Sequence, residues 1–190
     1  MALSHGLQGG IPALGHAMPA TRQDLFTRLD QLGIAHTTVD HAPIFTVAEG
    51  VEIKRGMPGL HSKNLFLKSR DGRLFLLCAE GSADIRVNRL HRHLGCKRLS
   101  FGSPELMEDV LGVTPGSVTL FALINDTEGR VQLLLDQEMA DAPIVNFHPL
   151  LNDATTAISG ADAVRFAKAT GHAPIILART TLADSEMSQS

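Results

Sequence analysis

Apolar positions recur at helical spacing in several parts of this sequence, between residues that are typical of helix ends. Thr21 is a typical N-cap, and leucine or phenylalanine then recurs every three or four residues until Gly33. A serine followed by the same spacing occurs twice more, once with proline at the first helical position. The pattern predicts helices over 21–33, 85–94, 103–112 and 159–171, with a short irregular helical piece over 47–56.

Shorter apolar runs lie between these segments and have the length of strands. Two runs flank "SRDG" and two flank "NDTEG", and both arrangements are typical of hairpins. Strands and helices alternate unevenly, which favours one α+β domain with a mostly antiparallel sheet over a doubly wound parallel one. The predicted strands are 34–39, 63–68, 73–79, 118–124, 131–135, 142–147, 155–158 and 174–178.

The composition is that of a globular domain with polar ends. The chain has 190 residues, of which 44% are hydrophobic and 19% charged, which fits one folded unit. No apolar run reaches the roughly 18 residues of a membrane span, and the N-terminus lacks the basic start of a secretory signal. We expect a flexible extension over 1–20, a domain over 21–178 and a polar tail over 179–190.

Positive charge is concentrated in the middle of the chain. Residues 54–98 contain eleven Lys and Arg against three acids, although the whole chain carries a net charge of −3. A basic surface on an acidic body is typical of polyanion binding, and the alternative is a solvated surface without a partner. The candidate phosphate contacts are Arg86, Arg89, Arg92, Lys97 and Arg98.

Several kinds of catalytic site are absent from the sequence. It contains no HExxH, P-loop, GxGxxG or GxSxG motif, and its two cysteines form no CxxC. His91 and His93 lie two apart on a predicted helix, so their side chains diverge and make a poor metal pair. An enzyme with this sequence is expected to use no metal, nucleotide cofactor or covalent nucleophile.

Four strings carry a family resemblance: "HAPIFTVAE" (41–49), "GLHSKNLFLK" (59–68), "LGVTPGSVTLFALIND" (111–126) and "FHPLLNDATTAIS" (147–159). Together they resemble the YbaK/ProX group of aminoacyl-tRNA editing domains, and most of all its free-standing Ala-tRNA(Pro) deacylases. The resemblance implies a mixed, barrel-like sheet flanked by helices and cytoplasmic hydrolysis of alanine from tRNA for proline. The resemblance implies that the protein uses no cofactor and binds neither membrane nor DNA. The implied partner is the mischarged tRNA, and prolyl-tRNA synthetase is a further candidate.

The resemblance also implies roles for individual residues. Lys63, Gly116 and His148 match the family's catalytic positions. Without the resemblance, the same residues would be interpreted as a solvated lysine, a plain turn and a structural histidine. Relatives carry proline where this chain has Leu120, so the amino acid removed could instead be Cys or Ser. A further alternative is a catalytically silent module that binds tRNA or a synthetase. The substrate-binding candidates are Phe45, Thr46, Asn64, Ser117, Thr119, Leu120, Asn152 and Thr156.

Overall fold

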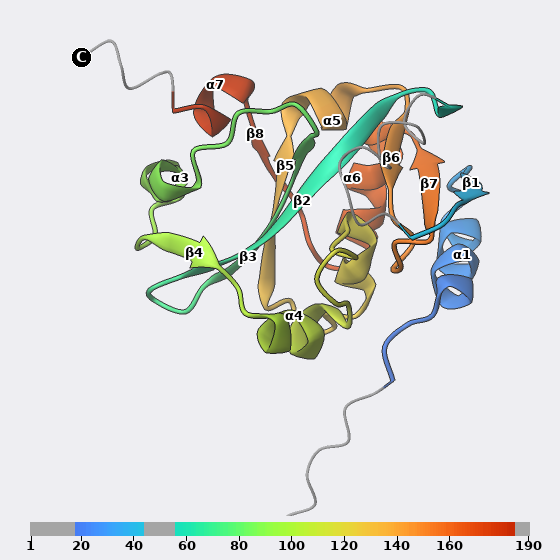
Figure 1. Cartoon of the computed structure of the whole chain (residues 1–190), viewed down its shortest axis with the longest axis horizontal. Helices are drawn as coiled ribbons and strands as arrows, with labels where there is room; N and C mark the ends of the chain where they lie inside the picture. The colour runs from blue at the N-terminus through green and yellow to red at the C-terminus, as the bar shows by residue number, and fades with distance from the viewer. Residues whose placement is uncertain (1–17, 44–55, 185–190) are drawn as a thin grey trace, which may run out of the picture.

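A computed structural model describes residues 18–43 and 56–184 of the chain (Figure 1). In this part, seven strands form one path in the order β1-β7-β6-β2-β3-β5-β8, and β4 pairs with β2 off the path. Four of the strand pairs are antiparallel and three are parallel, so the sheet is mixed. The strands are β1 Thr37–Asp40, β2 Leu60–Ser69, β3 Leu74–Glu80, β4 Leu99–Phe101, β5 Val131–Asp136, β6 Val145–Phe147, β7 Ala154–Ile158 and β8 Ile175–Leu177.

The helices largely follow the predicted spacing, because their ends are capped by the expected residues. Thr21 and Asp24 form a capping box at the start of α1, and Ser103 and Ser159 cap α4 and α6. Together with the mixed sheet they confirm a single α+β domain. The helices are α1 Arg22–Gln31, α3 Val87–Leu94, α4 Pro104–Leu111, α5 Gln137–Asp141, α6 Gly160–Ala169 and α7 Arg179–Leu182, with the 3₁₀ helix η1 Leu120–Ile124.

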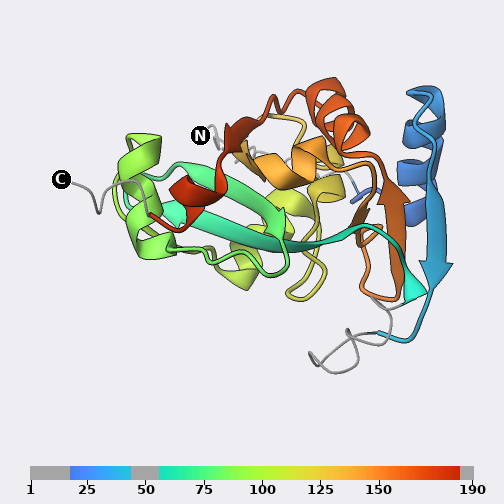
Figure 2. The same ribbon diagram turned by 90° about the horizontal axis from the view of Figure 1, so that it is seen from above.

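The long strand β2 connects the two ends of the molecule. Figure 2 shows α3 and α7 at one end, and α1 with β1 at the other. Successive side chains of a strand point to opposite faces of the sheet, and both faces of β2 and β3 are covered. Phe66 and Leu76 belong to one hydrophobic core, which α1, α4, η1 and α6 complete. Leu67 and Leu77 belong to a second core, to which α3 and α7 contribute.

The prediction of a hairpin across "NDTEG" is wrong. Residues 120–124 form η1, in which the Thr119 side chain accepts a hydrogen bond from the Phe121 N–H. The following strand, β5, pairs in parallel with β3 and β8. A short, continuous apolar run is compatible with a buried strand and with a buried helix. In this chain the Thr119 cap and the packing of residues 120–123 in the first core favour the helix η1.

The chain beyond Ala178 begins with ordered structure, although we expected a polar tail there. Residues 179–182 form α7, in which Leu182 is fully buried. The Leu182 carbonyl accepts a hydrogen bond from the Arg86 N–H just before α3. The buried Asp184 side chain then pairs with α3. The described helices include none that is long and apolar enough to span a membrane.

Candidate active site

Gly116 lies in a tight turn that its sequence explains. The Ser117 N–H donates to the Thr114 carbonyl at 3.0 Å, which closes a four-residue turn with Pro115 and Gly116 in the middle. Gly116 has φ of +91°, as the third position of a type II turn requires, and proline suits the second position. The Gly116 N–H donates to no described residue in the backbone hydrogen bonds, so this turn offers an exposed donor.

The loop between β6 and β7 lies beside this turn and is strained. A Cβ added at Gly116 would lie 3.9 Å from Asn152 Nδ2, so the two loops are in contact range. Leu150 has φ of +73°, a conformation that costs a non-glycine residue about 1–2 kcal/mol. The buried Leu150 side chain packs in the first core and holds this conformation. This packing fixes the course of the loop that carries His148 and Asn152.

His148 has a defined proton arrangement. Its Nδ1 lies 3.0 Å from the Ala154 carbonyl oxygen. Since a carbonyl oxygen can only accept, Nδ1 carries a proton and donates it to this hydrogen bond. This hydrogen bond fixes the orientation of the ring at the end of β6.

His41 is a site residue that the sequence did not single out. Its ring centroid lies 6.3 Å from that of His148 in an edge-to-face arrangement. Its Nδ1 donates to the Ala42 carbonyl at 2.9 Å, and its Nε2 lies within hydrogen-bond distance of Thr155 Oγ1, also at 2.9 Å. The available signal was its place as the first residue of the "HAPIFTVAE" string.

The strand register decides which predicted residues share a face of the sheet. His61 pairs with Asn146, and Asn146 pairs with Ala157. Alternation then places Lys63 and Thr155 on the same face as these residues. The same register places Asn64 and Thr156 on the opposite face.

The polar contacts of Asn64 and Thr156 fit that opposite face. Thr156 Oγ1 lies 2.8 Å from Thr38 Oγ1 and joins β7 to β1. Asn64 Nδ2 donates to Ser62 Oγ at 2.9 Å, while Asn64 Oδ1 is buried without a partner among the described residues. The structure therefore does not bring these two predicted binding residues to the face of Lys63.

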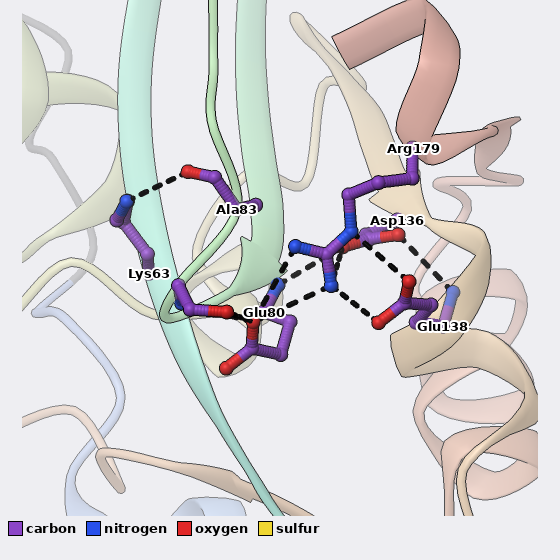
Figure 3. Close-up of polar contacts among 7 residues, drawn as sticks. Lys63, Glu80, Ala83, Asp136, Glu138 and Arg179 are labelled. Carbon is purple, nitrogen blue, oxygen red and sulfur yellow. Dashed lines mark hydrogen bonds and ion pairs between the residues drawn. The ribbon is translucent and has the colours of Figure 1, made fainter. Parts of the chain in front are cut away.

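Lys63 is held by the turn that follows β3 (Figure 3). Its Nζ donates to the Ala83 carbonyl at 3.0 Å. The same turn contains Glu80, whose carboxylate accepts hydrogen bonds from the Ser82 N–H and the Ser82 hydroxyl. Partial burial raises the pKa of the Glu80 carboxyl, but hydrogen bonds from Ser82 and Arg179 outweigh it, so the pKa lies below its usual value. Glu80 is thus a carboxylate at neutral pH.

Arg179 of α7 draws three carboxylates together beside this turn (Figure 3). Its Nη2 lies 3.3 Å from Glu80 Oε2 and 3.9 Å from Asp136 Oδ2, and its Nε donates to Glu138 Oε1 at 3.1 Å. Asp136 is fully buried and also accepts the Glu80 N–H at 3.1 Å. These contacts connect α7, β5 and α5 to the turn that holds Lys63.

The remaining substrate-binding candidates do not line a described surface near Lys63. Ser117 is 4% exposed, while Thr119 and Leu120 are fully buried. Leu120 packs in the first core as the first residue of η1, so it is a core residue in this chain. Phe45 and Thr46 lie outside the described residues.

The structure divides the predicted basic surface. Arg86 pairs with Asp84 at 3.1 Å, and Arg89 and Arg92 lie 3.1 and 3.9 Å from Asp184. Hydrogen bonds from His93 and Arg89 hold the pKa of Asp184 below its usual value, so it counters the charge of these arginines. Lys97 and Arg98 lie outside these pairs and line a separate hollow with Arg70 and His91.

Neither cysteine fits a nucleophile. Cys78 is fully buried in the first core, and burial raises the pKa of its thiol. Burial also raises the pKa of the Cys96 thiol; the nearby charge of Arg73 lowers it by less, and that of Asp71 raises it further. The described residues include no group of three or more His, Cys, Asp or Glu placed to hold a metal ion. What the site offers is a backbone donor, two imidazoles, an amide and an ammonium group.

Comparison with known proteins places the chain in a family. The model of the aminoacyl-tRNA editing domain matches residues 41–166. A Danio rerio protein named prolyl-tRNA synthetase associated domain-containing protein 1 is 36% identical over 82% of this chain and 86% of its own length. The prolyl-tRNA editing protein ProX of Acetoanaerobium sticklandii is 31% identical over 80% of this chain and 93% of its own.

Solved structures have the same fold. A crystal structure of a candidate trans-editing enzyme for prolyl tRNA synthetase superimposes with a TM-score of 0.62 at 18% identity, over 82% of this chain and 95% of its own. At this identity the likeness shows the fold alone, and the family match is independent of it. The chain belongs to the aminoacyl-tRNA editing domain family.

Proposed function

We propose that this chain is a trans-editing hydrolase that removes alanine from mischarged tRNA for proline. The observation that carries the proposal is that the Gly116 turn lies close to Asn152, on the loop that also carries His148, in a chain of the editing family. Relatives named for prolyl-tRNA editing and for association with prolyl-tRNA synthetase support the choice of tRNA and admit the synthetase as a partner.

The reaction needs no covalent nucleophile, because an aminoacyl ester is already activated. The oxygen of a water molecule adds to the ester carbonyl carbon, and the carbon–oxygen bond to the ribose then breaks. The ribose oxygen takes up a proton, so the products are alanine and a tRNA with a free terminal hydroxyl. The site has only to position the water and stabilise negative charge on the carbonyl oxygen.

Each described site residue has a role in this reaction. His148 positions the water or the substrate, since it lies on the loop beside the Gly116 turn and its ring is held by the Ala154 carbonyl. The Gly116 N–H stabilises the oxyanion, and removal of one such donor typically costs about 10²–10³ in kcat. Lys63 supplies a positive charge for the 3′ end of the tRNA. His41 positions substrate beside His148 through its contact with Thr155.

Selectivity for alanine follows from the limits of the synthetase. A synthetase pocket cannot strongly reject a smaller apolar side chain, since one methylene contributes only about 1–3 kcal/mol to discrimination. A second site that admits alanine and excludes proline by size removes the error. We assign this size selection to the segment of Phe45 and Thr46.

A deacylation panel tests this function. We expect release of alanine from Ala-tRNA(Pro), little release of Cys or Ser, and none of proline from Pro-tRNA(Pro). Lys63→Ala should lower kcat/KM by about 10²-fold, as expected when the transition state loses an electrostatic partner. Lys168→Ala removes an exposed lysine of α6 and is the matched control.

Three outcomes contradict parts of this proposal. Faster release of Cys or Ser than of alanine would assign a different substrate to the same site. Unchanged turnover in Lys63→Ala would remove the role given to that lysine. RNA binding without release of any amino acid would identify a catalytically silent binding module.

A further inference from the structure

A hollow lined by positively charged side chains lies at the end of the molecule remote from the start of β2. It has a volume of about 620 Å³ and is lined by Arg70, His91, Lys97 and Arg98. Arg70 follows β2, His91 belongs to α3, and Lys97 and Arg98 lead into β4, which Figure 1 shows side by side with α3. Three segments that are separate in the sequence thus bring their cationic or imidazole groups to one surface, which we call the basic hollow.

The cations of the basic hollow form no ion pair with an acid among the described residues. The side chains of Arg70, Lys97 and Arg98 make no hydrogen bond or ion pair with another described residue. The nearby carboxylate is Asp71, which accepts hydrogen bonds from Ser69 Oγ and from the backbone N–H of Lys97. The hydrogen bond from Ser69 lowers the pKa of Asp71, so it stays charged at neutral pH and partly offsets the three cations.

The neighbouring arginines of α3 and of its N-cap have a different environment. Arg86 is paired with Asp84, and Arg89 and Arg92 lie beside Asp184. A cation that already has a carboxylate partner gains less from a phosphate than one that has only water. The unpaired side chains of the basic hollow are therefore the stronger anion-binding part of this surface.

The position of the basic hollow indicates the size of its ligand. Lys63 and Arg70 are seven residues apart along one extended strand, which corresponds to about 23 Å. An aminoacyl ester with its terminal ribose cannot reach from one to the other. A tRNA acceptor arm can, and it carries a phosphate at every nucleotide.

We propose that the basic hollow binds backbone phosphates of the tRNA acceptor arm while its aminoacylated 3′ end lies at Lys63, Gly116 and His148. This inference rests on the proposed function for the identity of the RNA. Phosphate contacts fix the position and orientation of a nucleic acid without reading its sequence. The basic hollow thus supplies affinity and alignment, and the remote site supplies the chemistry.

The test compares two double variants of the full chain that remove equal charge. Lys97→Gln/Arg98→Gln changes the basic hollow, and Arg86→Gln/Arg92→Gln changes the acid-paired arginines of α3. Binding of labelled, uncharged tRNA(Pro) is followed by fluorescence anisotropy between 50 and 200 mM salt, about the range in which phosphate contacts change affinity most visibly. Thermal unfolding of each variant establishes that it is folded, and Arg70→Gln provides a third, single-charge variant.

We expect the hollow variant to bind about tenfold more weakly and to lower the slope of log K against log salt by about 2, one for each phosphate that is no longer neutralised. The α3 variant should change the slope by less than about 0.5, because its cations are already paired. In deacylation, the hollow variant should raise KM and leave kcat within about twofold, since the reacting groups are untouched.

The outcomes separate this inference from the proposed function. Equal losses of affinity in both double variants, or an unchanged slope in the hollow variant, would overturn the basic hollow as the phosphate site. If the hollow variant loses binding to phosphatidylserine vesicles but binds RNA as well as the wild type does, RNA is not the ligand of the basic hollow. If the wild-type protein releases no amino acid, the proposed deacylase function is refuted. If the hollow variant nevertheless binds RNA more weakly than the wild type, the basic hollow remains the phosphate site.

Discussion

Leu120 stands where the sequence resemblance leads us to expect proline, and the backbone around it suits either residue. Thr119 before it has φ of −152° and ψ of 154°, a conformation that also suits a residue before proline. Leu120 opens η1, where a helix does not need the backbone N–H of its first residue. The leucine side chain is fully buried in the first core. The same backbone can therefore carry either residue, and leucine adds apolar packing.

This explanation predicts the result of restoring proline. Leu120→Pro should retain deacylation within about threefold, because the turn at Gly116 keeps its geometry. It should lower the free energy of unfolding by about 1–3 kcal/mol, because a core side chain becomes smaller. Leu123→Pro, three residues further into η1, should cost more than about 3 kcal/mol because it removes an interior N–H. Urea unfolding monitored by circular dichroism measures both, and equal costs would contradict the assigned helix position.

The sequence could place some residues of the candidate site and not others, for identifiable reasons. Gly116 could be placed from "TPGS" alone, since proline followed by glycine is typical of a type II turn. His41 could not, because its contacts with Thr155 and His148 depend on the pairing of β1 with β7. Thr156 was expected at the substrate, and the same register places it on the other face. Periodicity within one segment contains no information on which strand becomes its neighbour.

At the scale of elements, the C-terminal helix α7 supports the turn that holds Lys63. Arg179 is bound to Glu80, Asp136 and Glu138, and the Glu80 turn presents the Ala83 carbonyl to the lysine. A four-residue helix is too short to form alone, so its tertiary contacts must maintain it. The sequence indicated a polar tail here because these contacts involve residues roughly 40 and 100 positions away.

Removing this guanidinium should affect both stability and activity. We expect Arg179→Gln to lower the free energy of unfolding by about 1–2 kcal/mol, since three carboxylates lose a shared partner that is itself partly exposed. A less ordered Glu80 turn should also lower kcat several-fold, with a smaller change in KM. Arg165→Gln is the matched control, because that arginine pairs with Asp162 on the surface and contacts no part of this turn. A kcat equal to that of the control would show that α7 has no part in positioning Lys63.

At the scale of the whole molecule, the candidate active site and the basic hollow lie toward opposite ends of β2. The site residues lie where β2 starts beside β6 and β7, and the basic hollow lies beyond its other end. The fold class and most helices followed from local pattern and capping. The parallel pairing of β3 with β5 did not, because it joins segments more than 50 residues apart.

The C-terminal segment also makes the stability of the whole domain depend on pH. Hydrogen bonds from His93 and Arg89 lower the pKa of Asp184, and hydrogen bonds from Ser82 and Arg179 lower that of Glu80 despite its burial. A carboxyl group whose folded pKa is lowered stabilises the fold above its unfolded pKa, about 4, and this contribution is lost as pH falls through the folded pKa. We therefore expect the midpoint of urea unfolding to be nearly constant between about pH 7 and pH 5 and to fall below about pH 4.5. Asp184→Asn should lower the midpoint at pH 7 and flatten its acid dependence, whereas Glu128→Gln, at an exposed position, should follow the wild type. A wild-type midpoint that stays constant or rises between pH 5 and pH 3 would contradict this role of the two carboxylates.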